Sequence, residues 1–463
     1  MSHHRLTYNI QVIQHRQEAR RVVAYHLKER TGLTEEAWAE IRATVSEILS
    51  AVEREGEPAV RRYSERFDGW SPSSFRVHED EVRRATANIS DDLQEHIAFA
   101  QEQVRGFAEL QRSTLVDEEW PTLPGVTLGQ RFIPVGSAGA YSPGGLYPLI
   151  ASAIMTVSVP KVAEVPRVVG CAPPRGPEGM HPPQLHAIAT SGADEILCLG
   201  GVQAFAAMAF GIEDIEPVDM LVGAGNAYVA EAKRQLFGTV GIDLLAGPTE
   251  VMVLADDSAD PRIVAADLLG QAEHGPTSPA TLVTTSERLA REVADAVDAW
   301  LEGEWPTKEV AGAAWRDHGA IVVCEDDEEA ASVADDMAPE HLEIQTEDPD
   351  WYLKRMNSYG TLFLGTHATV AFSDKAIGTN HVLPTRRAAR YTGGLWVGKF
   401  LKAVTYQRVT AEGSARVAES TAAIADAELM FGHALTARLR LDPDRFPDAR
   451  PVVSPAAQAE ERS

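Results

Sequence analysis

Cysteine is scarce in this chain, which has three cysteines in 463 residues: Cys171, Cys198 and Cys324. Each stands at the end of an apolar run, and none has the close spacing of a zinc-binding or redox-active pair. We therefore predict three buried and chemically inert strand residues. An odd number of cysteines also fits a reducing compartment.

Long apolar runs and an excess of basic residues are missing as well. No run of about 18 apolar residues occurs, and the N-terminus has no continuous apolar stretch, so we expect a cytoplasmic protein without a membrane partner. The formal net charge of -26 argues against nucleic acid as a partner. The acidity suits either solubility in general or a saline cytoplasm, and the sequence does not distinguish these.

A complete dinucleotide-binding fingerprint is the third absence. The segment Gly223-Ala-Gly225-Asn226 is only a partial likeness of Gly-x-Gly-x-x-Gly in the strand-to-helix position. The pattern alone therefore predicts no dinucleotide, and it does not separate NAD from NADP.

What is present is the composition of an ordinary globular protein, 44% hydrophobic and 24% charged. Thr34 can cap a helix with apolar residues at helical spacing from Trp38 to Val52, and Gly56 can end it. Helices are predicted to dominate up to about residue 112. Short apolar strands then alternate with amphipathic helices, which predicts parallel α/β structure. The expected strands lie at 165–171, 195–199, 218–222, 250–255, 281–285, 320–324 and 361–364.

These patterns predict two Rossmann-like parallel α/β domains with a ligand cleft between them, together with helical N- and C-terminal segments. The boundaries we predict are an N-terminal extension (1–33), a large α/β domain (34–140 and 250–385), a second α/β domain (141–249), a C-terminal segment (386–441) and a disordered tail (442–463).

Three segments carry the residues of a candidate active site. Gln271 and His274 stand three residues apart, so on one face of a helix both can reach a single metal ion. Glu340 and His341 set an acid beside a base. Asp374 stands seven residues before His381, with Gly378 between them where the backbone can turn sharply. Together they predict a metal-assisted acid/base site.

In this order, the segments resemble the histidinol dehydrogenase family, and the resemblance runs from about Glu35 to about Leu441. Further matching segments begin at Tyr141, Gly201, Gly223 and Ala246. The resemblance implies an intertwined homodimer in which the active site is shared between subunits. It also implies that segments 1–33 and 386–441 make dimer contacts, that the large α/β domain carries the metal and catalytic residues, and that the second α/β domain binds NAD.

The resemblance also implies a role for each matching residue. The zinc ligands of the family, with one Zn²⁺ per subunit, match Gln271, His274, Asp374 and His433. Donors of this kind suit Zn²⁺ or Mn²⁺. His433 and Glu428 would come from the partner subunit. His341 would be the base that takes the hydroxyl proton, and Glu340 would activate water for a second oxidation. The residues implied in substrate binding are Thr249, Gln271, His274, His341, Asp374, His381, Glu428 and His433.

The family's NAD contacts match Tyr141, Gln203 and Asn226. The turn Pro143-Gly-Gly145 provides a backbone that can approach a phosphate closely. Ala224 stands where the family usually has proline, so this loop departs from the pattern.

The alcohol substrate is suggested by a basic segment after His381, which holds Arg386, Arg387 and Arg390 followed by two lysines. Arginine forks match sulfonate, phosphate and carboxylate oxygens, which predicts an anionic substrate. The segment resembles the sulfopropanediol dehydrogenases of the family, which oxidise 2,3-dihydroxypropane-1-sulfonate to sulfolactate with two NAD. The alternatives are histidinol, for which the arginines would be structural, and a non-catalytic metal or dinucleotide sensor.

Overall fold

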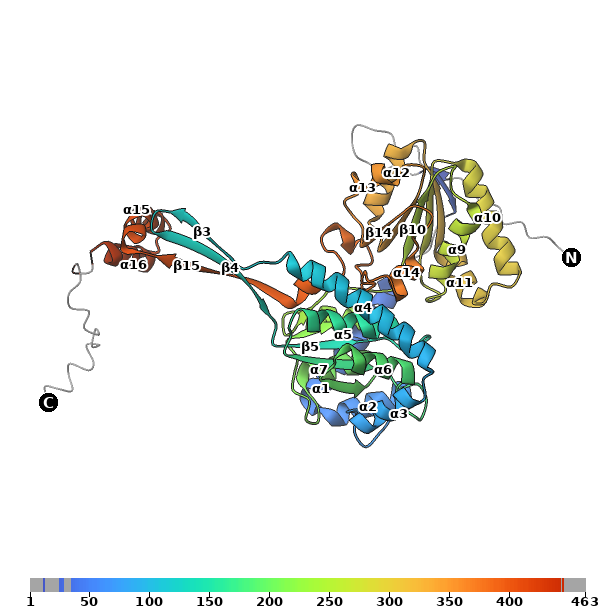
Figure 1. Cartoon of the computed structure of the whole chain (residues 1–463), viewed down its shortest axis with the longest axis horizontal. Helices are drawn as coiled ribbons and strands as arrows, with labels where there is room; N and C mark the ends of the chain where they lie inside the picture. The colour runs from blue at the N-terminus through green and yellow to red at the C-terminus, as the bar shows by residue number, and fades with distance from the viewer. Residues whose placement is uncertain (1–10, 13–24, 29–34, 443, 445–463) are drawn as a thin grey trace. The chain divides into compact units, whose positions relative to one another are not determined.

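The computed structural model describes residues 11–12, 25–28, 35–442 and 444 (Figure 1). The chain forms two compact units, of which the first comprises 1–114 and 134–401 and the second comprises 115–133 and 402–463. Most of the predicted disordered tail lies outside the described residues. None of the described helices is long and apolar enough to cross a bilayer.

The first unit contains a five-stranded parallel sheet in the order β7-β6-β5-β8-β9. Both faces are covered by helices, which is why the strands are almost uniformly apolar and their residues are mostly buried. The strands are β5 (Ser137–Tyr141), β6 (Arg167–Ala172), β7 (Glu195–Cys198), β8 (Met220–Val222) and β9 (Gly241–Ile242), and the helices between them are α5 (Ile150–Val162), α6 (Pro182–Ser191), α7 (Gly201–Phe210) and α8 (Ala227–Leu236).

The N-terminal helices belong to this same sheet, which corrects the predicted domain boundaries. They are α1 (Glu35–Glu55), α2 (Glu57–Asp68), α3 (Glu79–Ala87) and α4 (Asp91–Ser113). Helix α1 has the predicted apolar stripe, and its Ile41 and Val45 share one core cluster with Phe205 of α7. Helix α7 is apolar all round and almost wholly buried, so its outer face needs this cover. We had predicted that residues 34–140 form one domain with residues 250–385. In the structure, the core residues of α1 and α2 instead pack with the five-stranded sheet.

A second sheet in the first unit has seven strands in the order β1-β2-β12-β11-β10-β13-β14 (Figure 1). The five later strands pair in parallel, and β2 adds an antiparallel edge beside β12. The strands are β1 (Gln11–Val12), β2 (Tyr25–Lys28), β10 (Val251–Ala255), β11 (Ala280–Thr284), β12 (Gly319–Val323), β13 (His341–Gln345) and β14 (Thr361–Leu364). The helices are α9 (Pro261–Ala272), α10 (Glu287–Glu302), α11 (Lys308–His318), α12 (Asp327–Met337), α13 (Pro349–Leu353) and α14 (Val370–Lys375).

All the predicted strands are present, with bounds that differ by up to two residues. Strands β1, β2, β5, β9 and β13 of these two sheets were not predicted. Part of the predicted N-terminal extension pairs within this chain, where Lys28 Nζ donates to Gly319 O at 2.7 Å. The rest of that extension lies outside the described residues, so its dimer contact stays a prediction.

The three cysteines are buried and free, as predicted. Burial raises the pKa of all three thiols, that of Cys324 to about 12. They are therefore protonated at neutral pH and unreactive.

The second unit consists of a three-stranded sheet and two helices. The strands are β3 (Glu118–Leu123), β4 (Val126–Pro134) and β15 (Leu401–Val409), in the order β15-β4-β3, and the helices are α15 (Ala411–Ala427) and α16 (Phe431–Leu441). The predicted C-terminal segment 386–441 is thus divided, because residues 386–401 belong to the first unit and a strand precedes the helices. Alanines form the small core between the helices.

Candidate active site

A cavity of about 770 Å³ opens within the first unit. One wall comes from the carboxyl end of β5 and the loops that follow β7 and β8. The other comes from the loop before β10, the turn after α9, the start of β13 and the end of α14. Parallel sheets place ligands beyond the carboxyl ends of their strands, so the first wall is the expected place for a cofactor. The cavity agrees with the predicted cleft between the two α/β domains.

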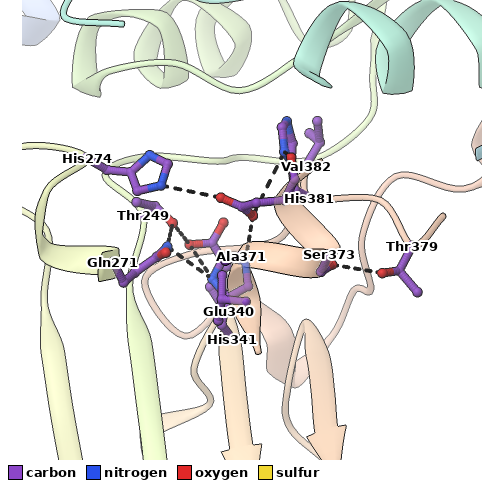
Figure 2. Close-up of polar contacts among 12 residues, drawn as sticks. Thr249, Gln271, His274, Glu340, His341, Ala371, Ser373, Thr379, His381 and Val382 are labelled. Carbon is purple, nitrogen blue, oxygen red and sulfur yellow. Dashed lines mark hydrogen bonds and ion pairs between the residues drawn. The ribbon is translucent and has the colours of Figure 1, made fainter. Parts of the chain in front are cut away.

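Glu340 and His341 lie at the amino end of β13, and both side chains are almost fully buried (Figure 2). One carboxylate oxygen of Glu340 accepts from Thr249 Oγ1 at 2.6 Å and from the Glu250 amide at 2.8 Å. His341 Nδ1 is 2.9 Å from the Glu250 carbonyl oxygen, so this nitrogen carries a proton. His341 Nε2 is buried and has no hydrogen-bond partner among the described residues. The sequence pair therefore becomes an oriented acid/base pair.

The surroundings of His341 favour its protonated form. Burial is the largest single influence and lowers the pKa, but the Glu340 and Asp374 carboxylates, together with the Glu250 carbonyl, raise the pKa of His341 to about 9. His341 Nε2 lies 3.8 Å from Asp374 Oδ1. A proton that arrives at Nε2 is thus stabilised by two carboxylates.

Three of the predicted metal ligands meet beside this pair. Gln271 lies in the last turn of α9, and His274 follows the helix rather than continuing it, which modifies the predicted single helical face. The His274 amide still donates to the Gln271 carbonyl, and His274 Nε2 lies 3.3 Å from Asp374 Oδ2. Gln271 Nε2 donates to Thr249 Oγ1 at 2.6 Å, so the amide oxygen is the atom left for a ligand.

These donors fit a divalent zinc or manganese ion. They are an amide oxygen, an imidazole nitrogen and a carboxylate oxygen, without a thiolate. Nearby histidines and a lysine outweigh the effect of burial and hold the pKa of Asp374 below its usual range, so the carboxylate is ionised. Among the described residues, no group of three His, Cys, Asp or Glu side chains is placed to hold a metal ion. The predicted ligands of the first unit include only two residues of these types, His274 and Asp374, because the third is Gln271. His433 in α16 and Glu428 just after α15 are exposed residues of the second unit, so their part in the site stays a prediction.

His381 lines the cavity and stabilises the turn that carries Asp374. Its Nδ1 donates to the Asp374 carbonyl at 3.1 Å, and its Nε2 lies 2.6 Å from Ser152 Oγ. The turn needs Gly378, whose φ is +114° and where a Cβ atom would lie 2.8 Å from the Gln103 carbonyl oxygen. Both ring nitrogens of His381 thus have protein partners, and its predicted bond to a substrate would replace the one to Ser152.

The three predicted NAD contacts all line the opposite wall. Tyr141 ends β5, and its hydroxyl oxygen accepts from the Gly201 amide at the start of α7. Gln203 of α7 donates to Asp68 Oδ2 at 2.8 Å. Asn226 caps α8 by accepting from the amides of Tyr228 and Val229. Helix α8 therefore begins at the cavity, where its amide groups favour an anion.

The predicted arginine segment borders the cavity, where the Arg386 amide donates to Glu250 at 3.1 Å, but its arginines do not line it. Arg386, Arg387 and Arg390 are exposed, and none lines the cavity. The Arg386 guanidinium stacks over the ring of Trp38 at 4.0 Å, and Arg390 Nε donates to the Arg387 carbonyl. The sequence missed three residues that do line the cavity, Asp68, Ser152 and Lys375, because no local pattern sets them apart.

Comparisons with known proteins find relatives along nearly the whole chain. A family model described as histidinol dehydrogenase matches residues 32–441. A histidinol dehydrogenase homolog of Shouchella clausii is 52% identical over 87% of this chain and 94% of its own length. A sulfopropanediol 3-dehydrogenase of Ruegeria pomeroyi is 47% identical over 91% of this chain and 97% of its own. The crystal structure of histidinol dehydrogenase from Elizabethkingia anophelis superposes with a TM-score of 0.83 at 33% identity, covering 90% of this chain and 94% of that one.

Proposed function

The chain belongs to the histidinol dehydrogenase family, and we propose that it oxidises a primary alcohol through a bound aldehyde to a carboxylate with two molecules of NAD. The observation that carries this proposal is the free, buried Nε2 of His341 beside the gathered side chains of Gln271, His274 and Asp374. A base without a protein partner, next to donors for a divalent ion, suits removal of a hydroxyl proton.

In the first oxidation, the neutral form of His341, which a pKa of about 9 makes the minor form at neutral pH, takes the hydroxyl proton of the substrate at Nε2. The alcohol carbon gives a hydride to the nicotinamide, so one alcohol and one NAD⁺ become one aldehyde, one NADH and one proton. The hydrogen bond from Nδ1 to the Glu250 carbonyl keeps the ring in the tautomer that this step needs. The two nearby carboxylates stabilise the imidazolium that forms.

In the second oxidation, water adds to the bound aldehyde, and the hydrate gives a second hydride. One aldehyde, one water and one NAD⁺ become one carboxylate, one NADH and two protons. Glu340 is proposed to take the proton from water. One of its oxygens is held by Thr249 and Glu250, and the other has no hydrogen-bond partner among the described residues.

The proposed cofactors are one Zn²⁺ per subunit and NAD. Gln271, His274 and Asp374 would hold the ion, with His433 contributed by a second copy of the chain. A bound zinc ion would polarise the substrate oxygen as a Lewis acid. Tyr141, Gln203 and Asn226 are the proposed NAD contacts.

A homodimer is part of the proposal, because the second unit exposes several large apolar side chains. Leu429, between the two helices, and Phe431, at the start of α16, are 74% and 63% exposed, and Trp120 and Leu123 of β3 are also exposed. A partner subunit that covered these residues would bury them. Glu428 and His433 lie in the same stretch and would then enter the partner's site.

We propose 2,3-dihydroxypropane-1-sulfonate as the alcohol and sulfolactate as the product. The support is 47% identity over nearly full length to a relative named sulfopropanediol 3-dehydrogenase. L-histidinol is the second candidate, supported by the family itself and by the histidinol dehydrogenase structure at 33% identity.

The test is to count NADH formed per molecule of substrate by the zinc-loaded protein with NAD⁺. Two NADH from the sulfonate, with none from L-histidinol, is the expected result. Two NADH from L-histidinol alone would assign the protein to histidinol oxidation. One NADH from either substrate would exclude the second oxidation.

A further inference from the structure

The positive charge of the cavity is concentrated in one residue. Among the residues that line it, Lys375 is the only lysine or arginine, whereas Asp68, Glu340 and Asp374 contribute carboxylates. The other basic groups of the lining are the imidazoles of His274, His341 and His381. An anionic substrate needs a permanent cation within reach, so this single ammonium group determines how the cavity can receive one.

Lys375 is the last residue of α14 and follows Asp374 directly. Its side chain is 56% exposed, and Nζ lies 3.7 Å from Asp374 Oδ2, beyond hydrogen-bond distance. Nζ has no hydrogen-bond acceptor among the described residues. Its three donors are therefore available to a molecule in the cavity.

The weak pairing with Asp374 has a consequence when the site is loaded. A divalent ion bound to Asp374 would neutralise the negative charge of that carboxylate. The Lys375 ammonium would then lie beside a second positive charge with no counter-charge of its own. An anionic group on the substrate would offset this repulsion, whereas a cationic substrate would increase it.

We infer that Lys375 is the residue that binds the anionic group of the substrate and so selects a sulfonate over a cationic amino alcohol. The inference rests on the proposed function, because it takes the alcohol to lie at His341. It assigns to Lys375 the anion-binding role that we had predicted for the three arginines of the basic segment, which do not line this cavity. The sulfonate of a three-carbon diol is attached two carbon atoms away from the alcohol carbon that is oxidised. Lys375 directly follows Asp374, whose carboxylate lies 3.8 Å from His341 Nε2, the proposed base.

The experiment compares Lys375→Met, Lys375→Arg and the wild type as zinc-loaded enzyme. Lys375→Met keeps the length and removes the charge, and Lys375→Arg keeps the charge. Lys354→Met, which removes an exposed lysine outside the cavity, is the matched control. Steady-state kinetics would be measured with 2,3-dihydroxypropane-1-sulfonate, with glycerol as an uncharged polyol and with L-histidinol. Calorimetric titration of the sulfonate without NAD reports binding separately from activity.

We expect Lys375→Met to weaken binding of the sulfonate and raise its KM by about 10- to 100-fold, as expected for loss of a charge-assisted hydrogen bond. The KM for NAD and for glycerol should stay within about twofold, and Lys375→Arg should keep most of the sulfonate affinity.

Two results would overturn the inference in different ways. Unchanged sulfonate binding in Lys375→Met, with an active wild type, would remove the role of Lys375 and leave the proposed function intact. A wild type that neither binds nor oxidises the sulfonate, yet oxidises L-histidinol, would overturn the proposed substrate and the inference with it.

Discussion

The chemistry of this protein depends at the residue scale on two adjacent side chains with different hydrogen-bond partners. Glu340 is held through one oxygen by Thr249 and Glu250, while His341 is held through Nδ1 by the Glu250 carbonyl. Each keeps one free atom for the cavity. The arrangement gives the two residues separable roles in the two oxidations.

Substituting each residue separately tests this division of labour. His341→Asn should lose both oxidations by about 10²- to 10⁴-fold, the usual contribution of a general base. Glu340→Gln should keep more of the first oxidation, because its main effect is on activation of water. The two half-reactions are measured separately, from the alcohol and from the supplied aldehyde. Equal losses in both half-reactions for Glu340→Gln would refute the division.

At the element scale, strand β13 is paired on both sides, with β10 and β14, and is yet polar on alternate positions. His341, Glu343 and Gln345 are all buried, and this alternation resembles a half-exposed strand or the start of a helix. The structure compensates by pairing the polar groups. Gln345 Nε2 donates to both Glu343 and Asp267, and the Val370 amide donates to Glu343. The cluster thereby connects α9, β13 and α14, which carry the site.

The two carboxyl groups of this cluster give a prediction for pH dependence. Burial is the main cause of the raised pKa of Glu343 and of Asp267, and the two groups hydrogen-bond each other. The folded protein thus keeps a proton that the unfolded chain releases above about pH 4.5, so this contribution to stability is present at low pH and is lost as the pH rises.

Glu343→Gln keeps the group neutral at every pH. Its free energy of unfolding relative to the wild type should therefore increase with pH above about 5, by up to about 1.4 kcal/mol per pH unit. Urea unfolding at a series of pH values measures this difference. Glu347→Gln, at an exposed position four residues away, is the control and should show no such trend. A flat difference for Glu343→Gln would mean that no shared proton exists.

A second prediction at this scale concerns the loop between β8 and α8. Lys233 and Asp243 form a fully buried ion pair. Both residues also hydrogen-bond to the backbone of Gly223: Lys233 Nζ donates to its carbonyl, and Asp243 accepts from its amide. Gly223 has φ of +123°, and a Cβ atom there would lie 2.2 Å from the Tyr141 carbonyl oxygen. The next three residues line the cavity, so the ion pair positions the proposed cofactor loop.

Lys233→Met leaves Asp243 buried without its cation and should cost about 3–5 kcal/mol of stability. Lys233→Met with Asp243→Asn should cost less, because no charge is left unpaired. In whichever variants stay folded, the KM for NAD should rise more than kcat falls. Urea unfolding and steady-state kinetics measure the two effects, and a loss confined to kcat would contradict a positioning role.

For the whole molecule, the proposed dimer makes a prediction about mixed subunits. His274→Asn and His433→Asn should each be inactive as homodimers. If His433 enters the partner's site, a mixed dimer of the two variants has one intact site and one with both substitutions. Unfolding and refolding the variants together in equal amounts should restore about a quarter of the wild-type activity. No recovery, with dimers formed, would place His433 in the site of its own chain.

The sequence by itself determined the α/β class, seven strands of the two parallel sheets and the residue types of the site, because apolar runs and short spacings are local properties. Only the tertiary structure decided which sheet the N-terminal helices cover, because an amphipathic stripe does not identify its partner. It also decided that β13 is a strand and that Lys375, rather than an arginine, faces the cavity. Burial and charge at these positions depend on contacts with segments far away in the chain, and no local pattern records them.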